Sequence, residues 1–581
     1  MSLPIPSVGV KGSDVYSSSG DPRVDLNVKC VRGATGDDLE AALKAVMGIG
    51  TQQAVEDAFV LAFNARNIRG GKGERDVFNK MMARLYGGYP ELVLGVLDFV
   101  PHYGCWGDLL TLGDPESAPI EFRDATLALF VKQLKEDSAS TEGTISLAGK
   151  WAPRERSANK KYAQLLAHRL FPHDTNHSSI MRKYRTLTGI LNARLKTVET
   201  YMCADRWDEI APESVPGRAG KLYNRAFLNL PTTYRVKDEA APTGEFRHPD
   251  DEKRMACRAH FEAHLKKAAE GKAKINGADT IFPHELVRQA ITLLQSEGYE
   301  SGGYAVTVDA SEKAHVLAVW RAMVEKAKAG GGLRRSLMMS DFSGSMQSSS
   351  MGDLPYYVSM AIGLLGAEVC SDEFKDLLMG FDSDPHLLQF PADADLFERI
   401  RMIQHSHIGN GLSTNFQAAL DLVLKRLKEK RCRPGEEPEN LIVITDMGWD
   451  QACGSSDRSQ YTGYGYRHVV KTAPWETQVA MIQESFKRAG EDMWGPGQGF
   501  TAPRIVIWNV AASAQTDFHA TADTPGVAML SGWSPTQFEI LQKEGPRQMT
   551  AYEMLRLELD DPKYQRVRDR IRELTSVHKE E

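Results

Sequence analysis

The sequence predicts two domains of different fold class: an α-helical repeat domain, then a doubly wound, Rossmann-like α/β domain. Its 581 residues exceed what one hydrophobic core accommodates. Apolar residues at three- and four-residue spacing dominate up to residue 330, and strand-like and helix-like runs alternate after it. We therefore expect a flexible lead-in over residues 1–35, a helical domain over 36–330, an α/β domain over 331–560 and a charged C-terminal helix or tail over 561–581.

The helical half is built from many short amphipathic segments. GDDLEAALKAVM from Gly36 and QQAVEDAFVLAFNARN from Gln52 are two of them, and strand-like runs are scarce between them and Lys328. Consecutive short helices are typical of antiparallel, HEAT-like helix pairs that stack as a solenoid or close into a ring. The sequence has no exact repeat, so it leaves the choice between solenoid and ring open.

The C-terminal half alternates apolar runs with amphipathic helices. SLMMS, NLIVIT and RIVIWNV are continuously apolar, and DLLMGF and HLLQF flank DSDP as the two strands of a hairpin would. Continuously apolar strands that alternate with helices predict a mainly parallel sheet covered on both faces. Ligands of such sheets bind beyond the carboxyl ends of the strands.

Five oxygen-bearing side chains are expected at that edge of the sheet. Asp341, Ser343 and Ser345 follow the first apolar run, Thr414 precedes a helix, and Asp446 directly follows NLIVIT. Two carboxylates and three hydroxyls suit a hard divalent cation, Mg²⁺ or Mn²⁺, with one position left for an outside ligand. The alternative is that the two aspartates only cap helices or form turns.

This set resembles the metal-ion-dependent adhesion site of von Willebrand factor A domains. The resemblance implies that the ion binds a carboxylate of a protein partner and does not break bonds. The sequence contains no Gly-rich P-loop, no H-E-x-x-H and no nucleophile elbow. We therefore expect a binding protein, with a metal-dependent hydrolase as the alternative. His405 and His407 are interpreted as an exposed pair in a loop.

Basic residues are concentrated in one part of the chain. From Lys150 to Arg235 there are 16 Lys and Arg against 7 Asp and Glu, although the whole chain has a net charge of −7. Such an asymmetry can mark a surface that binds a polyanion, but charge alone favours a solvated helix face.

A helical half followed by an A-type domain is similar to the Ro autoantigen, or TROVE-module, family, and most of all to an uncharacterised Ro-like branch of it. The resemblance implies a helical ring closed by the A-type domain, which binds small structured or misfolded RNAs as a ribonucleoprotein component. The segments that carry it, besides DFSGSM from Asp341, are RNIRGGKGERDVF from Arg66, PHYGCWGDLL from Pro101, KWAPRER from Lys150, ADRWDEIAPESVP from Ala204, KINGADTIFPHELV from Lys274 and GVAMLSGWSPTQFEIL from Gly526.

Three basic segments are the candidates for contacts with RNA. Cations neutralise phosphates, glycines allow a phosphate to approach the backbone, and an aromatic ring stacks on an unpaired base. The alternatives are structural turns with exposed cations and, for the whole protein, an interaction adaptor with no RNA role. The candidate residues are Arg66, Arg69, Lys72 and Arg75 in the first segment, Lys150, Arg154 and Arg156 beside Trp151 in the second, and Arg182, Lys183, Tyr184 and Arg185 in the third.

The N-terminus and the cysteines bear on the cellular compartment. The first residues, MSLPIPSVGVKGSDVYSSSG, have neither the basic start nor the apolar core of a signal peptide, and no apolar run is long enough to cross a bilayer. The seven cysteines form no C-x-x-C pair. We expect an intracellular, cytoplasmic protein with reduced thiols.

Overall fold

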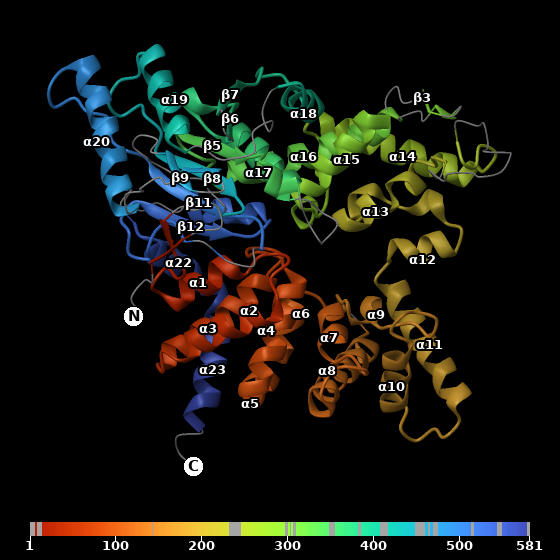
Figure 1. Cartoon of the computed structure of the whole chain (residues 1–581). Coiled ribbons are helices and arrows are strands. Elements are labelled where there is room, and N and C mark those ends of the chain that lie inside the picture. The colour runs from red at the N-terminus through yellow and green to blue at the C-terminus, as the bar shows by residue number, and fades with distance from the viewer. Residues whose placement is uncertain are drawn as a thin grey trace.

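The helical half forms a curved array in the computed structural model (Figure 1). Its helices are α1 (Pro22–Lys29), α2 (Gly36–Met47), α3 (Gln52–Arg66), α4 (Arg75–Gly88), α5 (Pro90–Gly95), α6 (Val100–Tyr103), α7 (Trp106–Leu112), α8 (Ile120–Ala139), α9 (Ala148–Trp151), α10 (Lys160–Leu170), α11 (His177–Arg194), α12 (Val198–Cys203), α13 (Gly217–Phe227), α14 (Glu252–Ala269), α15 (Pro283–Ser296) and α16 (Ala310–Ala329). The structure describes residues 6–8, 14–141, 143–231, 246–296, 300–301, 304–305, 309–347, 355–381, 385–406, 416–447, 459–462, 465–468, 475–512, 516, 518–542 and 549–577.

Both ends of this array contact the C-terminal half. At one end, α1 packs against strand β12 (Val527–Ser531) and helix α22 (Ala551–Leu559); at the other end, α15 and α16 pack against α17 (Pro355–Val369). The helices begin as the sequence predicts, because Thr35 and Thr51 accept hydrogen bonds from the backbone N–H groups of Asp38 and Ala54. The expectation of a helical N-terminal region is thus confirmed, whereas the HEAT-like type of repeat stays a prediction.

The C-terminal half contains a six-stranded sheet in the order β12-β11-β8-β5-β6-β7. Numbered along the chain, this is the 3-2-1-4-5-6 arrangement of doubly wound folds. All neighbouring pairs are parallel except β6 and β7, which form the expected hairpin. The other strands are β5 (Ser336–Asp341), β6 (Leu377–Phe381), β7 (His386–Gln389), β8 (Asn440–Thr445) and β11 (Arg504–Asn509), and the remaining helices are α18 (Leu396–His405), α19 (Phe416–Glu429), α20 (Trp475–Trp494), α21 (Phe538–Gln542) and α23 (Gln565–Val577).

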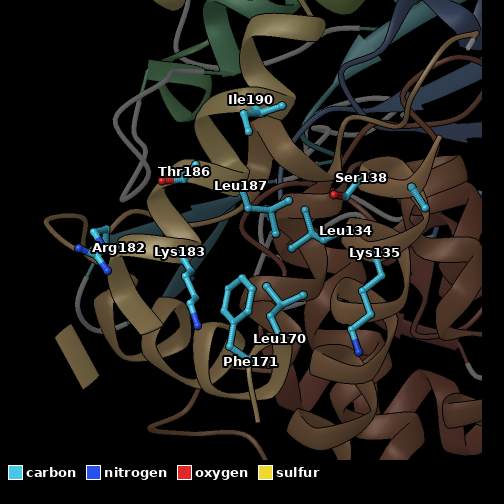
Figure 2. A pocket seen from close by; sticks show the side chains of 11 residues that line it. Leu134, Lys135, Ser138, Leu170, Phe171, Arg182, Lys183, Thr186, Leu187 and Ile190 are labelled. Carbon is cyan, nitrogen blue, oxygen red and sulfur yellow. The ribbon is translucent and has the colours of Figure 1, made fainter. Parts of the chain in front are cut away.

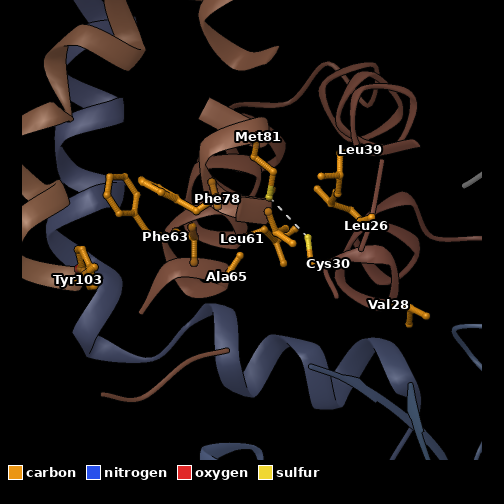
Figure 3. Packing of buried hydrophobic residues seen from close by; sticks show 14 of the residues in the cluster. Leu26, Val28, Cys30, Leu39, Leu61, Phe63, Ala65, Phe78, Met81 and Tyr103 are labelled. Carbon is orange, nitrogen blue, oxygen red and sulfur yellow. Dashed lines mark hydrogen bonds between the residues drawn. The ribbon is translucent and has the colours of Figure 1, made fainter. Parts of the chain in front are cut away.

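The two faces of this sheet belong to two hydrophobic cores. Along β5, Leu337 and Met339 join a core that continues into the N-terminal helices, while Met338 joins a second core with α15 to α18. Alternate residues of a strand point to opposite faces, which explains why the strands are apolar throughout. Figure 3 shows the N-terminal part of the first core, where Cys30 and Met81 are in contact beside a C-terminal helix. The helical and α/β parts therefore share their cores across the expected boundary at residue 330.

The two ends of the chain differ from the expected lead-in and tail. Residues 1–35 were expected to be flexible, but Pro22–Lys29 forms α1, in which Val24, Leu26 and Val28 are buried. This short helix packs between α3 and β12. Its burial therefore depends on tertiary packing, which the local sequence pattern does not reveal. The C-terminal segment was expected to be either a helix or a tail. It forms the helix α23, which packs on α3 and α5.

Smaller features complete the fold. Three two-stranded pairs are formed by β1 (Pro6–Val8) with β2 (Asp14–Tyr16), β3 (Glu300–Ser301) with β4 (Tyr304–Ala305), and β9 (Ser459–Thr462) with β10 (Gly465–His468). Within the described residues, no helix is both apolar and long enough to span a bilayer. The six cysteines in these ranges are free thiols.

Candidate metal site and basic surface

Asp341 and Asp446 lie at the point where the strand order of the sheet reverses. Asp341 is the last residue of β5, and Asp446 directly follows β8, its parallel neighbour. On either side of this pair the chain connections run in opposite directions, and doubly wound folds bind ligands beyond the carboxyl ends of the strands at such a point. The predicted convergence of these two loops at one sheet edge is therefore present in the structure.

Hydrogen bonds hold the Asp341 carboxylate in place. Its Oδ1 accepts a bond of 2.9 Å from the backbone N–H of Ser343, and its Oδ2 accepts one of 3.0 Å from the Thr445 hydroxyl. The hydroxyls of Ser343 and Ser345 are 3.2 Å apart. Ser343 is buried and Ser345 is exposed, so one serine of the pair lies inside the protein and the other at its surface.

The buried carboxylate of Asp341 lies near the half-buried carboxylate of Asp446, and no basic side chain of the described residues pairs with Asp341. Asp341 is fully buried and forms no ion pair with any described residue. Burial, and then the negative charge of Asp446, raise the pKa of Asp341 well above its ordinary value. An oxygen-rich edge with an excess of negative charge fits a hard divalent cation. Among the described residues there is no group of three or more His, Cys, Asp or Glu that could hold a metal ion.

The other predicted residues of this site are only partly placed. Thr414 and His407 lie outside the described residues. His405 is the last residue of α18 and lies 2.7 Å, through Nδ1, from the backbone oxygen of Arg401, so it has a local helical partner.

Sequence reasoning missed two residues that position the site. Thr445 orients Asp341, and its hydroxyl also accepts the backbone N–H of Met447 at 3.2 Å. Met447 has a φ of 69°, a left-handed conformation that is uncommon for residues other than glycine, and its carbonyl lies 2.9 Å from Nε2 of His519. The Thr-Asp pair at the end of an apolar strand signals Thr445, whereas no sequence signal points to His519.

For the Mg²⁺ that the sequence predicts at this edge, the raised pKa of Asp341 predicts an affinity that depends on pH. A cation has to displace the proton that burial favours, so we expect the affinity to fall as the pH drops below neutrality, by up to about tenfold per pH unit for one proton. Ordinary aspartates lose their charge only near pH ~3.9. Titration calorimetry between about pH 8 and about pH 5.5 measures this loss. A constant affinity over that range would contradict the prediction.

Two cations of the first basic segment are inside the protein. Lys72 is 1% exposed, and its Nζ donates to the Asn27 carbonyl and the Ser531 hydroxyl, each at 2.6 Å. Arg66 is 4% exposed and donates to Asp108 at 2.6 Å. The glycines also have a structural role, because a Cβ on Gly71 would lie 2.3 Å from the backbone oxygen of Asn64. Arg66 and Lys72 are therefore not accessible to a phosphate.

Arg69 and Arg75 are exposed but lie in different surroundings. Arg69 donates to the carbonyl of His102 at 2.9 Å, in a polar cavity of ≈ 540 Å³. Arg75 pairs with Asp108 at 2.7 Å, and its guanidinium lies 5.8 Å from the centre of the Trp151 ring. Arg75 thereby joins the first basic segment to the second one.

The second and third basic segments also lie side by side. The Tyr184 hydroxyl donates to the carbonyl of Pro153 at 2.9 Å, and Arg185 pairs with Glu155. Tyr184 is 1% exposed, so it has no ring face for an unpaired base, and its predicted stacking role does not fit the structure. Its large ring instead fills the space between α11 and the loop after α9. Lys183 is exposed and pairs with Asp174 at 2.7 Å.

These contacts define a basic surface that runs from α4 over α9 to α11. Arg154 and Arg156 are exposed in the segment between α9 and α10 and form no ion pair within the described part of the chain. Helices distant in sequence thus bring most of the exposed candidate cations to one region. The basic surface consists of Arg75, Arg154, Arg156, Arg185 and the half-buried Lys150, while Arg182, also on α11, lines the cavity between α8, α10 and α11.

Several of the segments that carry the family resemblance meet at one structural junction. The Trp533 ring lies 4.1 Å from the guanidinium of Arg32 and 4.8 Å, centre to centre, from His284, and Arg32 pairs with Glu74 at 3.1 Å. Thr536 donates to the carbonyl of Gly71 at 2.6 Å. The segments from Arg66, Lys274 and Gly526 therefore join the two ends of the helical array to the sheet.

Comparison with known proteins adds three similarities. Residues 335–579 match a family described as a domain of unknown function, DUF7788. The chain is 25% identical over 547 residues to "Uncharacterized protein L728" of Acanthamoeba polyphaga mimivirus, an alignment that covers 90% of this chain and 82% of that protein. The solved RO (RSR) protein of Deinococcus radiodurans shares 15% identity at a TM-score of 0.44, over 90% of this chain and 99% of that chain. The family match begins just before β5 and leaves the helical array outside it.

Proposed function

We propose that this protein is a binding protein whose Asp341–Asp446 edge holds Mg²⁺, or Mn²⁺, and docks a carboxylate of a protein partner. One observation carries the proposal: a fully buried carboxylate at the switch point, beside a second carboxylate and without an ion pair from the described residues. Asp341 and Asp446 would neutralise most of the charge of the ion, and Ser343 and Ser345 would supply hydroxyl ligands. The ion would supply a position for an outside oxygen ligand.

The test is direct cation binding by the purified full chain. We expect one Mg²⁺ per chain in titration calorimetry and an increase of the melting temperature with Mg²⁺ concentration, because a ligand that binds only the folded state stabilises it. Mn²⁺ should compete for the same site. A chain whose melting temperature and heat signal do not respond to either ion would remove the proposal.

A second proposal concerns RNA. The basic surface favours it, because three segments that are separate in sequence place their exposed cations in one region. We propose that this surface binds RNA through the phosphate backbone, as the Ro-like resemblance implies, with Arg154 and Arg156 as its central contacts. RNA that co-purifies with the protein and is lost on nuclease treatment would separate this function from that of an adaptor without an RNA role.

Charge reversal of Arg154 and Arg156 tests the RNA proposal. The double variant Arg154→Glu and Arg156→Glu should bind a single-stranded RNA oligonucleotide at least about tenfold more weakly, with a smaller dependence on salt, because fewer counterions are released. The matched control is Lys428→Glu with Lys430→Glu, two exposed lysines at the end of α19 and beyond it. Equal loss in both double variants, or in neither, in a filter-binding assay would contradict the assignment.

The RNA should be recovered intact after incubation with Mg²⁺, since we assign the ion no bond-breaking role.

A further inference from the structure

An open apolar groove lies between helices α8, α10 and α11. Figure 2 shows that the side chains of Leu134, Leu170, Phe171 and Leu187 converge on it from these helices, and that Ile190 lies at its upper end. Its cavity volume is ≈ 550 Å³, within the range of sites that hold several side chains of a ligand. The groove is remote in sequence from the cation site and lies on the helical array.

The exposure of Ile190 shows that the groove lacks a cover. The buried face of α11 includes Ile180, Met181, Tyr184 and Leu191, which belong to the first hydrophobic core. Ile190 is off this face and 55% exposed. A large apolar side chain in such a position costs free energy in water, and its burial by a partner would recover about 25 cal/mol per Å².

Cations lie on both sides of the apolar floor. Lys135 extends from α8, and Arg182 and Lys183 extend from α11 (Figure 2). Lys183 is paired with Asp174, and its Nζ lies 5.9 Å from the centre of the Phe171 ring. Lys135 and Arg182 are exposed and form no ion pair with the residues that the structure describes. The groove is thus an apolar channel with positively charged rims.

We propose that this groove binds an amphipathic helix of a partner protein whose apolar face is flanked by Asp and Glu. Apolar side chains spaced three and four residues apart would occupy the floor, and the acidic residues would face Lys135 and Arg182. The lining favours a peptide over a nucleic acid, because its apolar side chains are aliphatic except for Phe171, whose ring is half-buried and lies near the Lys183 ammonium. This site is independent of both the cation site and the basic surface, except that Arg182 borders the last.

The test uses a synthetic helical peptide with a leucine face and glutamate flanks, and a twin peptide in which every glutamate is replaced by lysine. We expect the acidic peptide to bind the full chain at least tenfold more tightly than its twin in fluorescence anisotropy. Ile190→Glu should weaken that binding at least tenfold, because it places a negative charge in the channel. Lys135→Glu, which leaves the apolar floor intact, should weaken it by a smaller factor.

Leu222→Glu is the matched control, since Leu222 is a 73% exposed apolar residue on α13, away from the groove. It should bind the acidic peptide as the unchanged protein does. The proposal is overturned if neither peptide binds, if both bind equally, or if Leu222→Glu loses as much affinity as Ile190→Glu. A single-stranded RNA that binds the unchanged protein and not Ile190→Glu, with no peptide binding, would overturn it in favour of a nucleic-acid site.

Discussion

Replacing Asp341 by asparagine is expected to weaken Mg²⁺ binding by at least about 100-fold. The substitution keeps the shape of a fully buried side chain and removes the charge that no described cation neutralises. Two carboxylates would supply most of the negative charge that faces the ion. Loss of one of them would halve that charge. Titration calorimetry and the shift of the melting temperature by Mg²⁺ measure the effect.

The same variant should fold at least as stably as the unchanged protein when no divalent cation is present. Two carboxylates in one buried edge repel each other, so removing one charge relieves an unfavourable term of the folded state. Asp523→Asn is the matched control, because Asp523 is an exposed aspartate of the same domain. If Asp341→Asn bound Mg²⁺ as Asp523→Asn does, the carboxylate would not be a ligand and the proposed cation site would be lost.

Replacing Asp57 by alanine is expected to lower the free energy of unfolding by about 3–5 kcal/mol. Asp57 lies on α3 with a fully buried side chain, and its carboxylate pairs with Arg568 and Arg556, each at 2.7 Å, and with Arg23 at 3.5 Å. These arginines come from α23, α22 and α1, so one carboxylate joins both ends of the chain. Its removal leaves three largely buried guanidinium groups with less opposing charge.

The matched control for Asp57 is Asp569→Ala on the outer side of α23. Its side chain is 60% exposed and pairs with Arg572 at 3.4 Å, so its removal should change stability by less than about 0.5 kcal/mol. Urea unfolding followed by circular dichroism compares the two variants. Equal stability of the two variants would show that the buried network does not hold the ends of the chain together.

The local patterns of the sequence were sufficient for most individual elements. Continuous apolar runs identified β5, β8 and β11, and three- and four-residue spacing identified α2 and α3. The positions of Asp341 and Asp446 after two such runs predicted that their carboxylates meet at one edge. The order of the strands was beyond the sequence, because the central parallel pair, β5 and β8, joins segments about 100 residues apart through contacts that no local pattern encodes.

Burial decided which of the predicted basic residues are available to a ligand. Lys72 and Arg75 are three residues apart in one Gly-rich segment, yet Lys72 is buried against Ser531 of β12 and Arg75 is exposed beside Trp151. The sequence indicates only that both are cations. Which one is held by internal hydrogen bonds depends on Asn27 and Ser531, which are 45 and 459 residues from Lys72.

By itself, the sequence determined the two fold classes, the apolar strands and the pair of aspartates that follow two of them, because these depend on local periodicity and residue chemistry. The tertiary structure alone decided that α1 and α23 close the chain on itself, that Thr445 orients Asp341, and that α8, α10 and α11 leave an uncovered groove. Such features result from packing between distant segments, in which shape and charge are matched only once the chain has folded.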